Sequence, residues 1–232
     1  MIPLRDTIPS RREPLATILL IIVNVMVFIG QSLMPDVKFA EFIYEFGFIP
    51  EEFLKSLARF GFFQASTYVP LFSSMFLHGN WAHLVSNMWV LWLFGDNVED
   101  AMGSIRFLIF YILCGLVAGF THFLFNPTSN VPTVGASGAI AGVMGAYFIL
   151  FPHARIVTLI PTFFFLPMFI HVPAFIYLIL WFISQLYSGV VQWVGGGSVG
   201  GIAWWAHISG FLAGVFIHKA FLARRRYRYY GG

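Results

Sequence analysis

The chain has 232 residues, of which 59% are hydrophobic and only 10% are charged. Since soluble domains carry about 25% charged residues, this composition excludes an ordinary soluble domain and indicates a protein that crosses a membrane several times. A formal net charge of +3 without a basic stripe argues against a nucleic-acid partner.

Six apolar segments are candidates for membrane-spanning helices. Such a helix needs about 20 mostly apolar residues to cross a hydrocarbon core of about 30 Å. The fourth segment is short and rich in glycine, which suits a helix buried among its neighbours. The predicted spans are 15–34, 70–94, 104–125, 135–151, 170–190 and 201–222. No small-residue cleavage site follows the first segment, so we expect it to be retained. The predicted fold class is all-α, a polytopic six-helix bundle.

Between the first two spans, residues 35–67 hold most of the acidic residues of the chain together with phenylalanines at helical spacing. Segments of this kind form amphipathic helices on a membrane surface. We therefore predict that this first outer loop is amphipathic and partly inserted in the membrane.

The stretch from Pro152 to Tyr187 is too long for one span and too short for two spans with a loop. Pro161, Pro167 and Pro173 disfavour one straight helix there, because proline interrupts helical hydrogen bonding. We expect residues 153–168 to form an irregular segment on the cytoplasmic side, with the fifth span beginning after it.

The distribution of basic residues predicts the orientation, because Lys and Arg favour the cytoplasmic side. With the N-terminus inside, the inner side holds Arg5, Arg11, Arg12, Arg106, Arg155 and the arginines of 224–228, whereas the outer side holds Lys38, Lys55 and Arg59. We therefore expect two cytoplasmic termini and Ser137 toward the outer face. The corresponding division is a cytoplasmic segment 1–14, a six-span domain 15–222 and a basic cytoplasmic tail 223–232.

Polar residues inside spans are costly and by default mark function. His83 and Asn87 are four residues apart, so they share one helix face and can donate hydrogen bonds toward one point. Taken alone, the two are better explained by hydrogen bonds to each other or to a neighbouring carbonyl, since such bonds are common between membrane helices.

Ser137 and His207 lie in spans that run in the same direction, at comparable depth from the outer face. Gly138 and Gly142 in one span, and Gly210 in the other, would let the two helices approach closely. Alone, Ser137 is more often a packing serine and His207 a core histidine. Combined with donors on a third helix, they favour chemistry instead, because a serine becomes a nucleophile when a neutral imidazole accepts its proton.

Attack on an amide carbonyl creates an oxyanion, which fixed donors must stabilise. Candidate donors are the backbone N–H of Ser137 at a helix start and the side chains of His83 and Asn87. No Asp or Glu within a span is available to orient His207, so the expected catalytic unit is a dyad.

These residues resemble the rhomboid intramembrane serine proteases. G-A-S-G at 135–138 matches the nucleophile motif of that family. H-G-N-W-A-H-L-V-S-N at 78–87 matches its second-span motif, and A-H-I-S-G-F-L-A-G at 206–214 matches its sixth-span motif. The order of the motifs also agrees, so the resemblance covers about residues 15–222.

The resemblance implies Ser137 as nucleophile and His207 as general base. It also implies His83, Asn87 and the Ser137 amide as oxyanion donors. Residues with an implied structural role near the site are His78, Gly135, Gly138, Gly142, Gly210 and Gly214.

Two further residues bear on the match to the family. Glu99 matches the glutamate-bearing turn of the family, and we expect it to act structurally with Arg106 as its partner. Some family members carry a tyrosine that stacks on the histidine at the position occupied here by Ala141. We expect Trp204 or Trp205 to pack on the ring instead.

The function that follows is an intramembrane serine endopeptidase that cleaves in or near the transmembrane segments of other membrane proteins. Its expected partners are those substrates and the lipid bilayer, with no metal, cofactor or nucleic acid. The expected location of this prokaryotic six-span type is the plasma (inner) membrane. Span five and the glycine-rich loop 194–201 are expected to act as a mobile gate.

The alternative is a non-catalytic relative that binds membrane proteins, although such relatives typically lack the serine or the histidine. A channel or transporter would show internal repeats, a metalloprotease H-E-x-x-H, and an aspartyl protease two acids within spans. The sequence shows none of these features.

Overall fold

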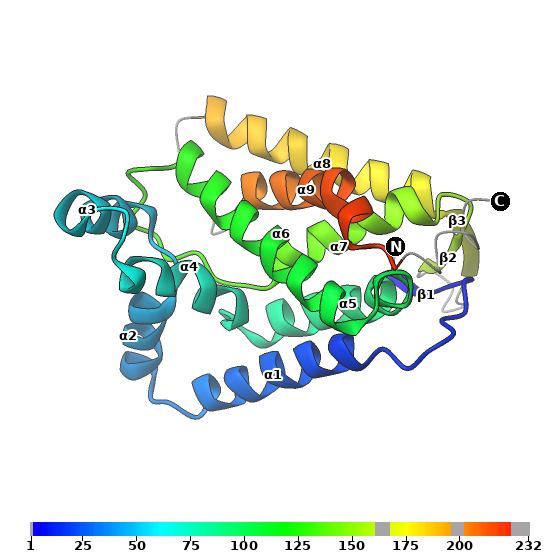
Figure 1. Ribbon diagram of the computed structural model, residues 1–232, viewed down its shortest axis with the longest axis horizontal. Coiled ribbons are helices and arrows are strands. Elements are labelled where there is room, and N and C mark those ends of the chain that lie inside the picture. Colours follow the sequence, from blue (N-terminus) through cyan, green and yellow to red (C-terminus); the bar gives the residue numbers. More distant parts are fainter. Residues whose placement is uncertain (1, 161–167, 196–201, 224–232) are drawn as a thin grey trace.

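Eleven helical segments and three strands make up the described part of the structure, a computed structural model that describes residues 2–160, 168–195 and 202–223 (Figure 1). The long helices are α1 (Leu15–Ser32), α5 (Trp81–Met102), α6 (Ser104–Phe125), α7 (Ser137–Leu150), α8 (Ala174–Val194) and α9 (Trp204–Phe221). The shorter ones are α2 (Asp36–Phe46), α3 (Pro50–Phe60), η1 (Ala65–Tyr68), α4 (Val69–Ser73) and η2 (Ser74–Phe76). Helices α2 and α3 agree with the amphipathic helices predicted for the first loop.

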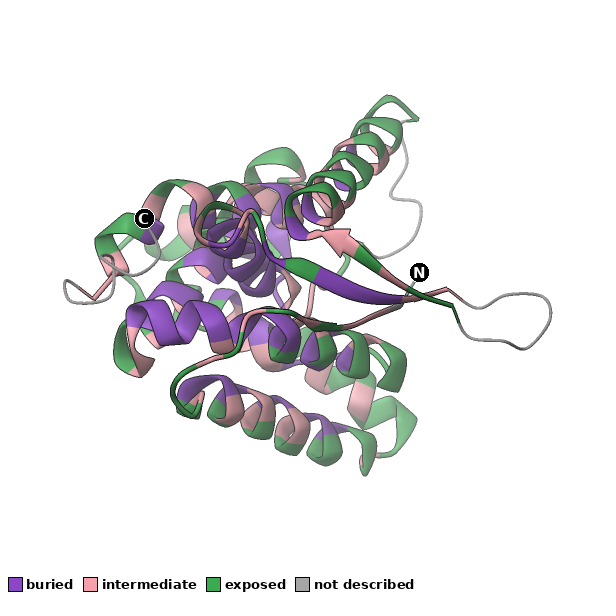
Figure 2. Cartoon of the chain, turned by 90° about the vertical axis from the view of Figure 1, so that its right-hand side faces the viewer, coloured by how far each residue is buried: buried purple, intermediate pink, exposed green. Residues whose placement is uncertain are grey.

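Helix α7 forms the centre of the bundle. Every residue from Gly138 to Tyr147 is buried, and the buried positions of the other helices face inward around it (Figure 2). Helix α8 differs, since it buries only Ala174, Leu178, Gln185 and Gly189. The core is therefore built on α7, whereas α8 contacts it along a narrow stripe.

Glycines bring α7 and α9 into backbone contact. A Cβ atom on Gly210 would collide with the carbonyl oxygen of Gly138, and one on Gly214 would collide with that of Gly142. Small residues permit such close approach between membrane helices, where packing replaces the hydrophobic effect as the driving force. The α7–α9 contact fixes the first turns of both helices relative to each other.

Among the described residues, three helices are long and apolar enough to cross a membrane: α1, α6 and α8. Helix α7 is apolar but shorter, and it is surrounded by protein. Because a helix shielded by its neighbours need not be apolar or long enough to face lipid, composition identifies the peripheral spans best.

The second predicted span, 70–94, begins too early. Residues 69–76 form α4 and η2, and α5 begins at Trp81 after Asn80 caps it by accepting a hydrogen bond from the His83 amide at 2.8 Å. The helix then continues to Met102 through residues that were expected to form a polar turn. Pro70 at the start of α4 and the Asn80 cap explain the delayed start.

An antiparallel sheet corrects the all-α expectation. Its strands are β1 (Ile2–Asp6), β2 (Arg155–Ile160) and β3 (Met168–Pro173), in the order β1-β2-β3. Residues 155–160 and 168 were expected to be irregular, and β1 lies in the segment 1–14. The run R-I-V-T-L-I is rich in β-branched residues, and strand pairing satisfies its backbone groups where a proline-interrupted helix would not. Residues 161–167 lie outside the described residues, as do 196–201 of the expected gate and 224–232 of the basic tail.

Glu99 has a different partner from the one expected. Its carboxylate accepts hydrogen bonds from the amides of Ala16 and Thr17, at 2.9 and 2.8 Å, and from the hydroxyls of Thr17 and Ser104. Arg106 instead donates to the carbonyl of Leu222 at 2.9 Å. Glu99 thus caps the N-terminus of α1, where free amides favour an anion, and the expected Glu99–Arg106 pair is wrong.

Candidate active site

Ser137 is the first residue of α7, at the end of an extended loop. Two residues earlier, Gly135 adopts φ +126°, and its amide donates to the Ser74 carbonyl at 2.9 Å. A Cβ on Gly135 would lie 2.7 Å from Cε1 of His83, so both the backbone angle and the space require glycine. Ala136 provides no side-chain cap. The first amides of α7 are therefore free of helical partners and available to an anion.

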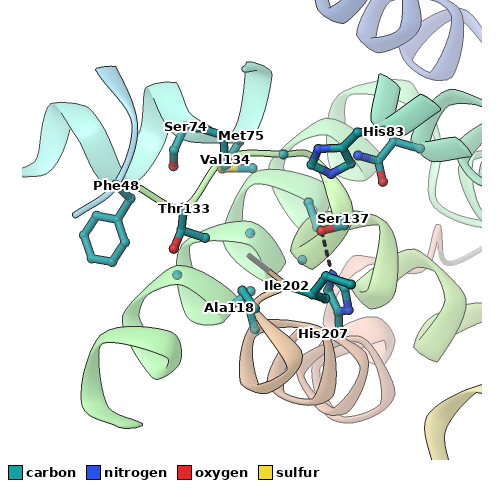
Figure 3. Close-up of a pocket in the computed structure, with 18 of the residues that line it drawn as sticks. Phe48, Ser74, Met75, His83, Ala118, Thr133, Val134, Ser137, Ile202 and His207 are labelled. Atoms are coloured by element: carbon teal, nitrogen blue, oxygen red, sulfur yellow. Dashed lines mark hydrogen bonds between the residues drawn. The ribbon is translucent and has the colours of Figure 1, made fainter. Parts of the chain in front are cut away.

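His207 reaches Ser137 across the α7–α9 contact. Its Nε2 atom lies 2.7 Å from the Ser137 hydroxyl oxygen, and Figure 3 shows Ser137 between the rings of His83 and His207. Both residues are half-buried. This separation is within the range in which a base can take the proton of a nucleophile.

The second ring nitrogen of His207 is hydrogen-bonded as well. Nδ1 lies 2.8 Å from Oε1 of Gln185 on α8. The ring also contacts Trp181 and Trp204, with centroid separations of 6.1 and 6.2 Å. Of the two expected tryptophans, Trp204 contacts the ring, whereas Trp205 stacks on Phe125.

Gln185 was not among the site residues expected from the sequence, because it belongs to none of the motifs. The available signal was a glutamine inside the apolar run F-I-Y-L-I-L-W-F-I-S-Q-L-Y. Polar residues at such positions are costly without a partner.

His83 and Asn87 lie on the first two turns of α5, against the loop that carries Ser137. A Cβ on Gly135 would lie 2.8 Å from Nε2 of His83 and 3.6 Å from Nδ2 of Asn87. His78, fully buried before α5, lies with Nε2 at 3.0 Å from Nδ2 of Asn87. Since an amide NH2 has two hydrogens, one can bond His78 while the other stays available.

A cavity of about 490 Å³ joins these groups, and Ser137, His207, His83 and Asn87 all line it. In Figure 3, His83, Ser137 and His207 lie at one end of the cavity, while Phe48 and Thr133 lie at the other. Gly135 and Gly138 also line it, whereas Gly142, Gly210 and Gly214 are absent from its lining and pack α7 against α9 and α6. In the part of the chain that the structure describes, no group of three or more His, Cys, Asp or Glu is placed to hold a metal ion.

Fold and site together define a class of helical membrane protein. In it, a serine at a helix start is hydrogen-bonded to a histidine of a second helix, and both residues line a cavity. Residues 65–224 match the family model described as the Rhomboid domain. The chain belongs to the rhomboid family.

Sequence similarity to individual rhomboid proteins extends over part of the chain. The chain is 42% identical over 76 residues to the rhomboid protease GluP of Bacillus subtilis, which is 33% of this chain and 14% of that protein. It is 31% identical over 102 residues to the human mitochondrial presenilin-associated rhomboid-like protein, 43% of this chain and 26% of that protein. Over 92 residues it is 32% identical to rhomboid protein 1 of Saccharomyces cerevisiae mitochondria, 38% of this chain and 27% of that protein. The chain thus aligns with about a quarter or less of the length of these relatives.

Proposed function

We propose that this chain is an intramembrane serine endopeptidase that hydrolyses a peptide bond in or near the transmembrane segment of another membrane protein. The observation that carries the proposal is the 2.7 Å contact between the Ser137 hydroxyl and His207 Nε2 at the wall of a cavity. Family membership supports it, and one relative is named a rhomboid protease.

In the proposed reaction, His207 Nε2 takes the proton of Ser137 as the hydroxyl oxygen attacks the substrate carbonyl carbon. The tetrahedral intermediate then collapses, and His207 returns the proton to the departing amine. This leaves an ester on Ser137. Water attacks the ester with His207 again as base, which releases the acid and restores the hydroxyl.

The oxyanion would be bound by the free amide of Ser137 and by the side chains of His83 and Asn87. These groups line the same cavity as the hydroxyl, and Gly135 holds the serine loop against both side chains. Donors fixed before the reaction stabilise the developing charge without reorganisation. His78 would keep the carboxamide of Asn87 in place.

We also propose that α1, α5, α6, α7, α8 and α9 are six spans of a prokaryotic-type rhomboid in the plasma (inner) membrane. Strand β1 pairs with β2, and the Ala223 amide donates to the Ala101 carbonyl. Both described chain ends therefore lie at the end of the bundle opposite Ser137. The position of these chain ends and the distribution of Lys and Arg both support two cytoplasmic termini around the domain 15–222. They also support an active site toward the outer face.

The substrate would enter from the bilayer, and α8 is the helix most suited to move because only four of its residues are buried. The competing function is a non-catalytic relative that holds membrane proteins without cutting them. A cavity would serve that role too, but it would not require a serine hydroxyl and an imidazole at hydrogen-bonding distance.

The proposal is tested with purified protein in liposomes and a fluorescently labelled single-span substrate. We expect cleavage by the wild type and none by Ser137→Ala or His207→Ala. Ser209→Ala is the matched control, since Ser209 lies on the same helix α9 and its hydroxyl donates to the Trp205 carbonyl. Cleavage unchanged in either dyad variant, or substrate bound but uncut by the wild type, would overturn the peptidase assignment.

A further inference from the structure

Gln185 is buried on the thin stripe by which α8 contacts the bundle. The stripe consists of Ala174, Leu178, Gln185 and Gly189, and Gln185 is its polar member. A helix that buries four residues would gain more packing from an apolar side chain at this position. What an apolar side chain could not provide is the hydrogen bond that Gln185 makes with His207.

The chemistry of the amide fixes the direction of that bond. Oε1 of Gln185 can only accept, so the 2.8 Å contact requires a hydrogen on His207 Nδ1. In a neutral imidazole, the hydrogen on Nδ1 leaves Nε2 as an acceptor. Nε2 is the atom that faces the Ser137 hydroxyl at 2.7 Å.

A second set of hydrogen bonds fixes the orientation of the amide itself. Nε2 of Gln185 donates to the Ser184 hydroxyl oxygen at 3.0 Å and to the Trp181 carbonyl at 3.4 Å. The Ser184 hydroxyl is itself a donor to Trp181 at 2.6 Å, so its oxygen is free to accept. Turning the amide over would place its oxygen against the Trp181 carbonyl and its NH2 against His207 Nδ1. That arrangement would move the imidazole hydrogen to Nε2 and disable the base.

We propose that Gln185 is a positioning residue that holds His207 in the tautomer able to accept the Ser137 proton. The inference rests on the proposed peptidase function and extends it from a dyad to a series of hydrogen bonds, in which Ser137 donates to His207, His207 donates to Gln185 and Gln185 donates to Ser184. In this series of hydrogen bonds, the neutral amide of Gln185 takes the place that a carboxylate holds in a serine–histidine–aspartate triad. The two tryptophans hold the ring plane, and Gln185 sets its protonation.

Three variants separate positioning from simple packing. Gln185→Met keeps the length of the side chain but removes the acceptor, and Gln185→Glu keeps an acceptor and adds a charge. Gln192→Met, two turns further along α8 and half-buried, is the matched control.

We expect Gln185→Met to lower kcat about 10- to 100-fold with little change in KM, because part of the general-base contribution is lost. Gln185→Glu should retain most of kcat and move the acidic limb of the pH–kcat profile to higher pH, because a nearby anion stabilises the imidazolium.

The ring tautomer is measured directly by 15N NMR of histidine-labelled protein, with His207 signals assigned by their loss in His207→Ala. We expect the wild type to carry its hydrogen on Nδ1, and Gln185→Met to shift toward Nε2. A wild-type ring protonated on Nε2, an unchanged tautomer in Gln185→Met, or a Gln185→Met kcat within twofold of the control would each overturn the proposal. If the wild type cleaves no substrate, the peptidase assignment fails, and the tautomer measurement alone then decides the role of Gln185.

Discussion

Two groups of polar side chains lie at opposite ends of α5 and α7, and they differ in how far they are satisfied. The cavity cluster consists of Ser137, His207, His83 and Asn87 and lies at the first turns of these helices. The sheet-end cluster consists of Asp6, Thr17, Asn97, Glu99, Ser104 and Tyr147 and lies near their last turns. Both interrupt an apolar bundle, where each unsatisfied polar group is expensive.

In the sheet-end cluster, the carboxylates of Glu99 and Asp6 accept hydrogen bonds from other members of the cluster and from nearby backbone amides. Glu99 accepts four hydrogen bonds, and Asp6 accepts from Tyr147 and Asn97. In the cavity cluster, the amides at the start of α7 and the second amide hydrogen of Asn87 face a cavity instead. Saturated polar groups stabilise a fold, whereas fixed donors left available beside a nucleophile are what catalysis requires.

The largest effect that separates the clusters should come from the oxyanion donors. We expect Asn87→Ala or His83→Ala to lower kcat about 10²- to 10³-fold, the usual loss for one such donor. The midpoint of thermal unfolding in detergent should change little in His83→Ala, and it should fall moderately in Asn87→Ala because buried His78 loses its hydrogen-bond partner. Unchanged kcat together with a large loss of stability would place both residues with the structural cluster.

A smaller effect should follow from separating α7 and α9. In Gly210→Ala the new methyl group collides with the Gly138 carbonyl, and a shift of about 1 Å in reacting groups costs about 100-fold in rate. Gly30→Ala in α1 is the control, since a Cβ there meets nothing within 4 Å. Equal cleavage rates for the two variants would show that the close helix contact does not position His207.

Removal of the Glu99 carboxylate should affect stability instead of chemistry. We expect Glu99→Ala to lower the free energy of unfolding by about 2 kcal/mol, because the buried amides of Ala16 and Thr17 lose their acceptor. The kcat of the protein that remains folded should stay within a few-fold of wild type. Glu13→Ala, an exposed carboxylate close to the same helix start, serves as the comparison.

The smallest effect concerns pH at the sheet end. Burial raises the pKa of Asp6 above its ordinary value, against the opposing hydrogen bond from Tyr147. Because the folded-state pKa is the higher one, Asp6 favours folding fully only below its unfolded pKa, and this contribution is lost as pH rises through the folded pKa. Asp6→Asn should therefore flatten the fall in thermal stability as pH rises above the ordinary pKa of a carboxyl group, whereas Glu13→Gln should leave the curve unchanged. Asp96, linked to Asp6 through Asn97, remains as a second carboxylate in both proteins.

The sequence predicted the helical elements best where apolar runs were uninterrupted. The ranges expected for the first and third spans nearly coincide with α1 and α6, because a long apolar run has few alternatives in a membrane. Residues 155–160 and 168–173 are apolar too, but β2 pairs with β1, a segment about 150 positions away, as well as with the nearby β3. Local pattern could not reveal that contact.

The site shows the same division. Motif spacing singled out Ser137 and His207, and the structure brings the two together. Gln185 belongs to no motif, and its role depends on how α8 is rotated against α9. Arg106 was expected as the partner of Glu99 because it is close in sequence. The actual partners are at the N-terminus of α1, more than 80 residues away, and only the tertiary fold brings them together.

The central claim is that His207 activates Ser137 as a nucleophile, and reaction with a fluorophosphonate probe tests it most directly. The probe forms a covalent bond only with an activated serine, so no substrate has to be known. We predict that peptide mass spectrometry will locate the adduct on Ser137 in the wild type, and that His207→Ala will remain unlabelled. An adduct on another serine, or labelling of Ser137 that persists without His207, would contradict the account.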